Sequence, residues 1–145
     1  MQRRNTASPT FDTLLRSVRR VSEDPRHHLG QLGERLAAEH LVRRGFQILE
    51  RNYRTRWGEL DIVAFDGRTL SFCEVKTRRL GPDGTVTPLE AIRARKRSRI
   101  RKMAGSWMRE RRYRAYAPVI RCDAIGVVFD RAGELVAIEH LEGAF

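Results

Sequence analysis

The sequence predicts an α/β fold, because stretches with helical spacing of apolar residues alternate with short apolar runs that are typical of strands. The expected order is helix, three strands, helix and two strands, within 145 residues that suffice for one domain with a hydrophobic core. Residues 1–28 lack sustained periodicity, and Arg and Ser dominate much of this segment, which favours a flexible basic arm. The folded domain is expected over residues 29–145.

The first helix is expected over residues 29–44, followed by a strand. Helical spacing is kept by Leu29, Leu32, Leu36, Ala37 and Leu41. Gly45 supplies a natural helix stop. An apolar run that begins at Phe46 then predicts a strand that continues toward Asn52 or Arg54.

The second helix is expected to begin after Thr87. Thr87 is a suitable N-cap, Pro88 suits the first helical position and Glu90 completes a capping box. One apolar stripe then runs through Leu89, Ile92, Ile100, Met103 and Trp107 to about Glu110. Two further strands are expected at residues 119–129 and 135–141.

The strands at 59–65 and 68–77 are expected to form a hairpin, because the Asp66-Gly67 dipeptide between them favours a two-residue turn. This turn places Glu59 opposite Glu74, and side chains that are opposite each other share one face of the sheet. The period-two alternation then gathers on one face Glu59, Asp61, Phe72, Glu74 and Lys76. The hairpin therefore predicts a face that carries three acids and a lysine.

Asp61 and Glu74 are diagonal neighbours in this register, about 6–8 Å apart at Cβ, so their carboxylates could share one Mg²⁺ or Mn²⁺. Such an ion would lower the pKa of a bound water and stabilise charge on a phosphodiester. Lys76 is the candidate base or electrostatic stabiliser, and Glu59 is a possible supporting acid. The alternative is an ordinary ion pair between Glu74 and Lys76 on a solvated face. Because apolar Phe72 shares the face, unpaired charges there would be costly, which favours a metal site.

One residue on each expected helix points to the same site. Glu34 lies at the margin of the apolar stripe of the first helix and is a candidate for a further metal ligand. The alternative is that Glu34 is a surface acid that flanks the stripe. Lys96 falls inside the stripe of the second helix, between Ile92 and Ile100. It either extends to solvent or points into a site that binds phosphate.

The charge balance favours a polyanionic partner. The chain has 29 Lys and Arg against 18 Asp and Glu, a net charge of +11, which suits nucleic acid or an anionic membrane surface. Basic residues are dense around the second helix, as sequence-independent phosphate binding requires, although a solvated basic face is the alternative. The candidate nucleic-acid contacts are Lys96, Arg93, Arg97, Arg99 and Arg78. The expected partner is DNA, with RNA as a further possibility.

Several other classes of protein find no support in the sequence. No stretch approaches the ~20 apolar residues of a membrane span, and no apolar run suggests a secretory signal, so a cytoplasmic location is expected. Cys73 and Cys122 lie in apolar runs and are expected to be buried free thiols, because no CxxC spacing suggests zinc or a disulfide framework. Asp123, two residues after Arg121 on an expected strand, is interpreted as a structural partner of that arginine.

The motifs of this chain resemble those of a known family. The segments that carry the resemblance are GERLAAEHLVRRGFQILERNYR, WGELDIVAFDGRTLSFCEVKTR, the helix that contains Lys96 and the closing HLEGAF. Over roughly residues 29–145 they resemble the YraN family of small bacterial proteins. That family is similar to archaeal Holliday-junction resolvases and belongs with the PD-(D/E)xK nuclease-like superfamily. The resemblance implies a restriction-endonuclease-like αβββαβ core, with a mixed central sheet flanked by helices.

The resemblance also implies roles for individual residues. It places the acidic pair of the superfamily on Asp61 and Glu74, its lysine on Lys76 and the acid of its first helix on Glu34. Leu60 departs from the motif, which has proline at that position. Resolvase-like relatives act as dimers on two-fold junctions, so a homodimer is possible by analogy.

The leading functional hypothesis is a Mg²⁺-dependent endonuclease that hydrolyses phosphodiester bonds in structured or branched DNA. The first alternative is a nucleic-acid-binding module that has a nuclease-like fold and does not cleave. A second alternative is a basic adaptor that binds other proteins.

Overall fold

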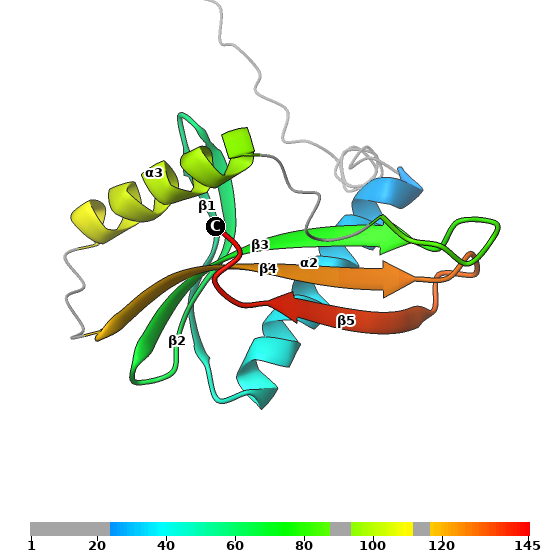
Figure 1. Cartoon of the computed structure of the whole chain (residues 1–145), viewed down its shortest axis with the longest axis horizontal. Coiled ribbons are helices and arrows are strands. Elements are labelled where there is room, and N and C mark those ends of the chain that lie inside the picture. Colours follow the sequence, from blue (N-terminus) through cyan, green and yellow to red (C-terminus); the bar gives the residue numbers. More distant parts are fainter. Residues whose placement is uncertain (1–23, 88–93, 112–116) are drawn as a thin grey trace, which may run out of the picture.

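The computed structural model describes residues 24–87, 94–111 and 117–145 (Figure 1). Most of the predicted basic arm and the predicted phosphate contact Arg93 lie outside these residues, as do Pro88 and Glu90 of the predicted helix start. Among the described residues, no helix combines the length and the apolar character needed to cross a membrane.

The elements follow the order that the sequence predicts, namely helix, three strands, helix and two strands. They are α2 (Pro25–Arg43), β1 (Gln47–Thr55), β2 (Gly58–Phe65), β3 (Thr69–Arg79), α3 (Ala94–Glu110), β4 (Val119–Phe129) and β5 (Leu135–Leu141).

The five strands form one mixed sheet in the order β1-β2-β3-β4-β5. Neighbouring strands are antiparallel except β3 and β4, which are parallel. The chain passes from β3 to β4 through α3, because parallel neighbours need a long crossover connection. The predicted fold class is confirmed: this is an α/β fold consistent with a restriction-endonuclease-like core.

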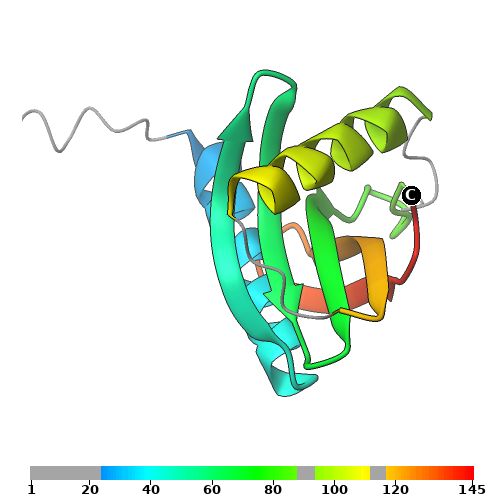
Figure 2. The ribbon, with the colours of Figure 1, turned by 90° about the vertical axis from the view of Figure 1, so that its left-hand side faces the viewer.

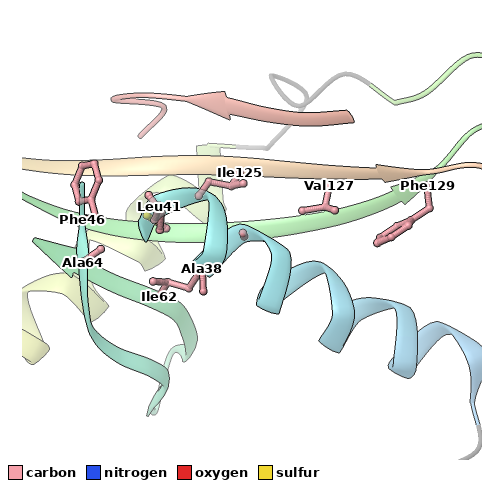
Figure 3. Packing of buried hydrophobic residues seen from close by; sticks show 10 residues of the cluster. Ala38, Leu41, Phe46, Ile62, Ala64, Ile125, Val127 and Phe129 are labelled. Atoms are coloured by element: carbon pink, nitrogen blue, oxygen red, sulfur yellow. The ribbon is translucent and has the colours of Figure 1, made fainter. Parts of the chain in front are cut away.

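The two helices cover opposite faces of the sheet (Figure 2). On one face, Ala38 and Leu41 of α2 pack with Ile62 and Ile125 of the strands (Figure 3). On the other face, Ile100, Met103 and Trp107 of α3 pack with Val63, Leu70 and Phe72. Because side chains alternate between the two faces of the sheet, β2 and β3 contribute residues to both cores. The helices α2 and α3 each bring charged residues to the same sheet.

The helix α2 begins earlier than the sequence pattern suggests, at Pro25 instead of Leu29. Asp24 is the N-cap: its side chain accepts a hydrogen bond from the backbone nitrogen of Arg26. The predicted stop is confirmed, because Gly45 adopts φ +90° directly after the helix, a conformation that glycine tolerates best.

The register of the β2–β3 hairpin differs from the prediction by two residues. Phe65 pairs with Leu70, so four residues form the loop instead of two. The Asp66 side chain causes this, because it accepts hydrogen bonds from the backbone nitrogens of Arg68 and Thr69 and so closes a longer turn. The prediction that Glu59 lies opposite Glu74 is therefore wrong. A shift of two residues preserves the alternation, and the faces predicted for β3 are unchanged.

Candidate metal centre and nucleic-acid surface

The paired part of the β2–β3 ladder ends at Ile62 and Cys73. Beyond this pair the Asp61 carboxylate takes the place of a backbone acceptor: its Oδ2 accepts a hydrogen bond of 2.7 Å from the backbone nitrogen of Val75. Asp61 therefore lies at the point where the two strands separate, and β3 fixes the direction of its side chain.

The alternation of side chains along β2 breaks at Asp61. Leu60 packs in the core beneath α3, whereas Ile62 packs in the core beneath α2. Residues two positions apart share a face in a regular strand, so β2 is irregular here. The neighbouring strand is unusual at the same level: Asn52 has φ +55°, which is uncommon for a residue other than glycine. This irregularity brings Asp61 within reach of α2.

Three carboxylates converge at this irregularity. Ligand oxygens of Glu34 from α2, Glu59 and Asp61 all lie within 4.8 Å of one another. The Asn52 amide lies 3.0 Å from Glu59 Oε1 and 3.1 Å from Glu34 Oε2, and donates to both when its nitrogen faces them. Glu34 was predicted as the acid from the first helix, and Glu59 as a supporting acid. Together with Asp61 they form one group, which we call the acid cluster.

The pKa of Asp61 is raised to about 7, first by burial and then by the negative charge of Glu74. The hydrogen bond from Val75 opposes this shift, and the charges of Glu34 and Glu59 add to it. The pKa of Glu34 is also raised, first by burial and then by Glu59. The acids therefore destabilise one another's charged forms, and a cation among them would relieve that repulsion.

The donor set suits a hard divalent cation. Carboxylate oxygens are the ligands that Mg²⁺, Mn²⁺ and Ca²⁺ prefer, and the acid cluster contains no histidine or cysteine ligand. Because burial and neighbouring acids raise the pKa of Asp61 to about 7, a cation among these carboxylates would favour the ionised form of Asp61. The residues thus fit a magnesium or manganese ion.

Glu74 is turned toward α3, where Lys96 Nζ forms an ion pair with Glu74 Oε1. The two side chains are 12% and 25% exposed, so the pair is largely shielded from solvent. Lys96 therefore does not extend to solvent but pairs with an acid of the sheet, and phosphate binding by this residue stays a prediction. Glu74 thus lies beside the acid cluster and acts on Asp61 through its charge, while a lysine balances it.

Lys76 follows Glu74 by two residues on β3, so both side chains belong to the same face. Lys76 is exposed, and no ion pair joins it to another of the residues that the structure describes. The predicted lysine therefore lies on the same strand face as Glu74, two residues further along the chain, and is exposed to solvent.

The exposed face of α3 is basic. Its described basic residues that face solvent are Arg97, Arg99, Arg101, Lys102 and, in the last turn, Arg109. Ser98 and three of these residues line a shallow depression of about 520 Å³. The opposite face of α3 packs on the sheet, so the helix presents these charges outward. We call this the α3 basic surface.

Arg78 does not belong to that surface. It is buried, and its guanidinium bonds to the backbone oxygen of Thr87 and to the Glu139 carboxylate. It reaches Glu139 across Gly126, where an added Cβ would overlap the guanidinium. This position joins β3 to β5, a role in packing that the sequence pattern did not indicate.

A second carboxylate, Asp123, is fully buried on β4, where it lies opposite Cys73 of β3. As predicted, it pairs with Arg121, at 2.7 Å between Arg121 Nε and Asp123 Oδ1. Burial raises the pKa of Asp123, but hydrogen bonds from His140, Arg121, the Gly143 backbone nitrogen and Ser71 outweigh burial and lower the pKa to about 2. Asp123 is therefore a fully satisfied structural carboxylate, and the part played by His140 was not predicted.

Comparison with known proteins identifies the family. A model of the "Uncharacterised protein family UPF0102" matches residues 33–127. A UPF0102 protein of Parafrankia sp. is 48% identical over 118 residues, which cover 81% of this chain and 95% of the relative. A UPF0102 protein of Pelotomaculum thermopropionicum is 41% identical over 122 residues, which cover 84% of this chain and 98% of the relative. The chain belongs to the UPF0102 family, also called YraN, as the motifs of the sequence indicate.

Proposed function

We propose that this UPF0102 protein is a Mg²⁺- or Mn²⁺-dependent endonuclease that hydrolyses phosphodiester bonds in structured or branched DNA. The observation that carries the proposal is the acid cluster, in which the oxygens of Glu34, Glu59 and Asp61 lie within 4.8 Å of one another. A structural carboxylate acquires donors, as Asp123 does, whereas Asp61 has one donor and several acids around it. This arrangement favours a site for a cation.

Asp61 and Glu34 are the proposed metal ligands, with Glu74 beside them and Glu59 in support. A divalent ion bound there would lower the pKa of a water molecule and stabilise negative charge on the phosphoryl oxygens. The hydrogen bond from the Val75 backbone nitrogen orients the Asp61 carboxylate, so this ligand is fixed before a substrate arrives.

Lys76 is the proposed residue that acts on the substrate directly. It is exposed on the same face of β3 as Glu74, so its ammonium group would stabilise the charge that develops on the phosphate during cleavage. Lys96 and the α3 basic surface would hold neighbouring phosphates, through contacts that do not depend on base sequence. The expected cytoplasmic location and the possible homodimer also remain predictions.

The proposal is tested by incubating the protein with branched, flapped and linear DNA, and with RNA, in the presence of Mg²⁺ or Mn²⁺. We expect metal-dependent products from branched or flapped DNA, and loss of these products in Asp61→Ala and in Lys76→Ala. Glu134→Gln is the matched control, because Glu134 is an exposed acid in the turn between β4 and β5. This variant should cleave like the wild type.

Tight, salt-sensitive DNA binding without products from any substrate would reject the nuclease and favour the alternative, a binding module that does not cleave. Equal cleavage by the wild type and Asp61→Ala would reject the acid cluster as the site. Absence of salt-sensitive binding to any nucleic acid would favour the adaptor.

A further inference from the structure

A cleft of about 770 Å³ lies between the N-terminal half of α2 and the edge strand β1. Its size falls within the range of sites that bind small ligands, of about 300–1,000 Å³. Two residues of the acid cluster, Glu34 and Glu59, are part of its lining. The cleft therefore opens onto the proposed metal site, from the side of the sheet that α2 covers.

The rest of the cleft is strongly basic. Four arginines line it, namely Arg26, Arg35, Arg51 and Arg54. All four are exposed, and only Arg54 forms an ion pair, with Glu59, among the residues that the structure describes. The charge of Arg51 also acts on Glu34. Exposed guanidinium groups such as those of Arg26 and Arg35 are suited to phosphate, which they bind in a bidentate manner. The cleft is thus a basic channel that ends at acids.

The shape of the cleft distinguishes it from the α3 basic surface. The cleft is lined by residues of α2 and β1 and by Glu59 of β2. The α3 basic surface lies instead on a helix that covers the other face of the sheet, as Figure 2 shows for the helix. A channel of this volume suits a few nucleotides of one strand, because the known single-strand sites are narrow basic grooves that follow the backbone. A duplex requires a broad, open basic surface, such as that of α3.

We propose that the cleft between α2 and β1 binds a single strand of DNA through its phosphates, and that the α3 basic surface binds the adjoining duplex. The inference rests on the proposed function and names its substrate class: DNA in which a single-stranded arm leaves a duplex at the acid cluster. The bases of the arm can stack on the guanidinium planes or on His27, which also lines the cleft.

The test measures the binding of three fluorescent DNA probes by fluorescence anisotropy at a series of salt concentrations. The buffer contains EDTA, which removes divalent metal ions and so prevents cleavage. The probes are a single strand, a duplex, and a duplex with a single-stranded arm. The cleft variant is Arg35→Gln combined with Arg51→Gln, and the surface variant is Arg97→Gln combined with Arg101→Gln. The control is Arg131→Gln, an exposed arginine in the β4–β5 turn that lines neither site. Thermal unfolding confirms that each variant is folded.

We expect the cleft variant to lose about tenfold in affinity for the single strand and for the armed duplex, with a salt slope smaller by about 2. Its affinity for the duplex should match that of the control. The surface variant should instead lose affinity for the duplex. Single-strand binding by the cleft variant that equals the control would overturn the inference, as would equal losses on all three probes.

Failure of this inference is distinguishable from failure of the proposed function. The binding preferences are measured without metal, so they test the cleft alone. If the wild type does not cleave DNA with Mg²⁺, the nuclease is rejected. The proposal that the cleft binds the single strand would still stand.

Discussion

Asp61 and Asp123 are two carboxylates on neighbouring parts of one sheet that have opposite surroundings. Asp123 accepts hydrogen bonds from Arg121, His140, Ser71 and the backbone of Gly143, and its pKa is lowered to about 2. Asp61 accepts one bond, from a backbone nitrogen, and burial together with nearby acids raises its pKa to about 7. The fold therefore supplies Asp123 with a full set of hydrogen-bond donors and leaves Asp61 among other negatively charged groups.

The difference teaches which carboxylate is structural and which is available for chemistry. A buried charge that has full hydrogen-bond partners contributes to a specific fold, and a ligand has nothing to add to it. A charge that its neighbours repel stores unfavourable energy, which a bound cation would release. The acid cluster, and not the Asp123 network, is therefore the candidate functional site.

The largest expected effect is that of Asp123→Asn. The change removes the buried carboxylate that pairs with Arg121 and His140, and Arg121 keeps only the more exposed Glu142, at 3.3 Å, so we expect the free energy of unfolding to fall by about 3–5 kcal/mol. Urea unfolding monitored by circular dichroism measures it. Asp61→Asn is the matched comparison, and it should leave stability at pH 8 unchanged or raise it. A larger loss in Asp61→Asn than in Asp123→Asn would reverse the assignment of roles.

The two acids should also give opposite pH dependence of stability. The raised pKa of Asp61 means that the folded chain holds a proton between about pH 4 and 7 that the unfolded chain releases, so stability falls as pH rises through this window. The change amounts to at most about 4 kcal/mol, at about 1.4 kcal/mol for each pKa unit. For Asp123 the lowered pKa gives stability that is present above about pH 4 and is lost as pH falls toward 2.

Urea unfolding at a series of pH values measures both windows. Asp61→Asn should flatten the profile between pH 4 and 7 and leave the loss below pH 4 unchanged. A wild-type profile that rises steadily from pH 4 to 7, with no contribution from Asp61, would contradict the raised pKa of that residue.

The sequence alone predicts part of the fold and part of the candidate site. The order of the elements follows from apolar periodicity. Asp61 was predicted from the alternation of side chains in the hairpin, Glu34 from its place at the margin of a helical stripe and Lys96 from its place inside one. The hairpin register was not predictable from Asp66-Gly67, because the Asp66 side chain closes a longer turn than the dipeptide suggests.

Three other features depend on contacts that no local pattern encodes. The positive φ of Asn52 accompanies the break in β2 and the convergence of Glu59 with Asp61, and asparagine gives only a weak signal of that conformation. The contact of His40 with His140 joins residues 100 positions apart, so only the folded chain reveals it. Burial of Arg78 has the same origin, because its partner Glu139 lies on another strand.

A smaller effect is expected from Gly33→Ala, which tests how α2 positions Glu34. An added Cβ at Gly33 would overlap the Thr77 hydroxyl of β3, so the helix would have to move and we expect a loss of about 2 kcal/mol. Gly30→Ala is the control in the same helix: its Cβ meets nothing within 4 Å, and the change should add about 0.5–1 kcal/mol. Urea unfolding compares them, and equal stability of the two variants would contradict close packing at Gly33.

The smallest effect on stability is expected from Lys96→Met, about 1 kcal/mol, because methionine keeps the apolar packing of the lysine stem and Glu74 retains some contact with solvent, at 12% exposure. Its effect on metal binding should be clearer. Lys96 neutralises Glu74, so its removal leaves more negative charge for Mg²⁺, and Mg²⁺ should bind more tightly. Calorimetric titration measures this, and weaker Mg²⁺ binding in Lys96→Met would contradict the competition between lysine and metal.

The most direct test of the acid cluster is calorimetric titration of the protein with Mn²⁺ at pH 8, where Asp61 is ionised. We expect saturable binding to the wild type, at least about tenfold weaker binding to Asp61→Asn, and binding to the exposed-acid control Glu134→Gln that matches the wild type. Equal affinity of the wild type and Asp61→Asn, or no saturable binding to the wild type, would contradict a metal site at Asp61.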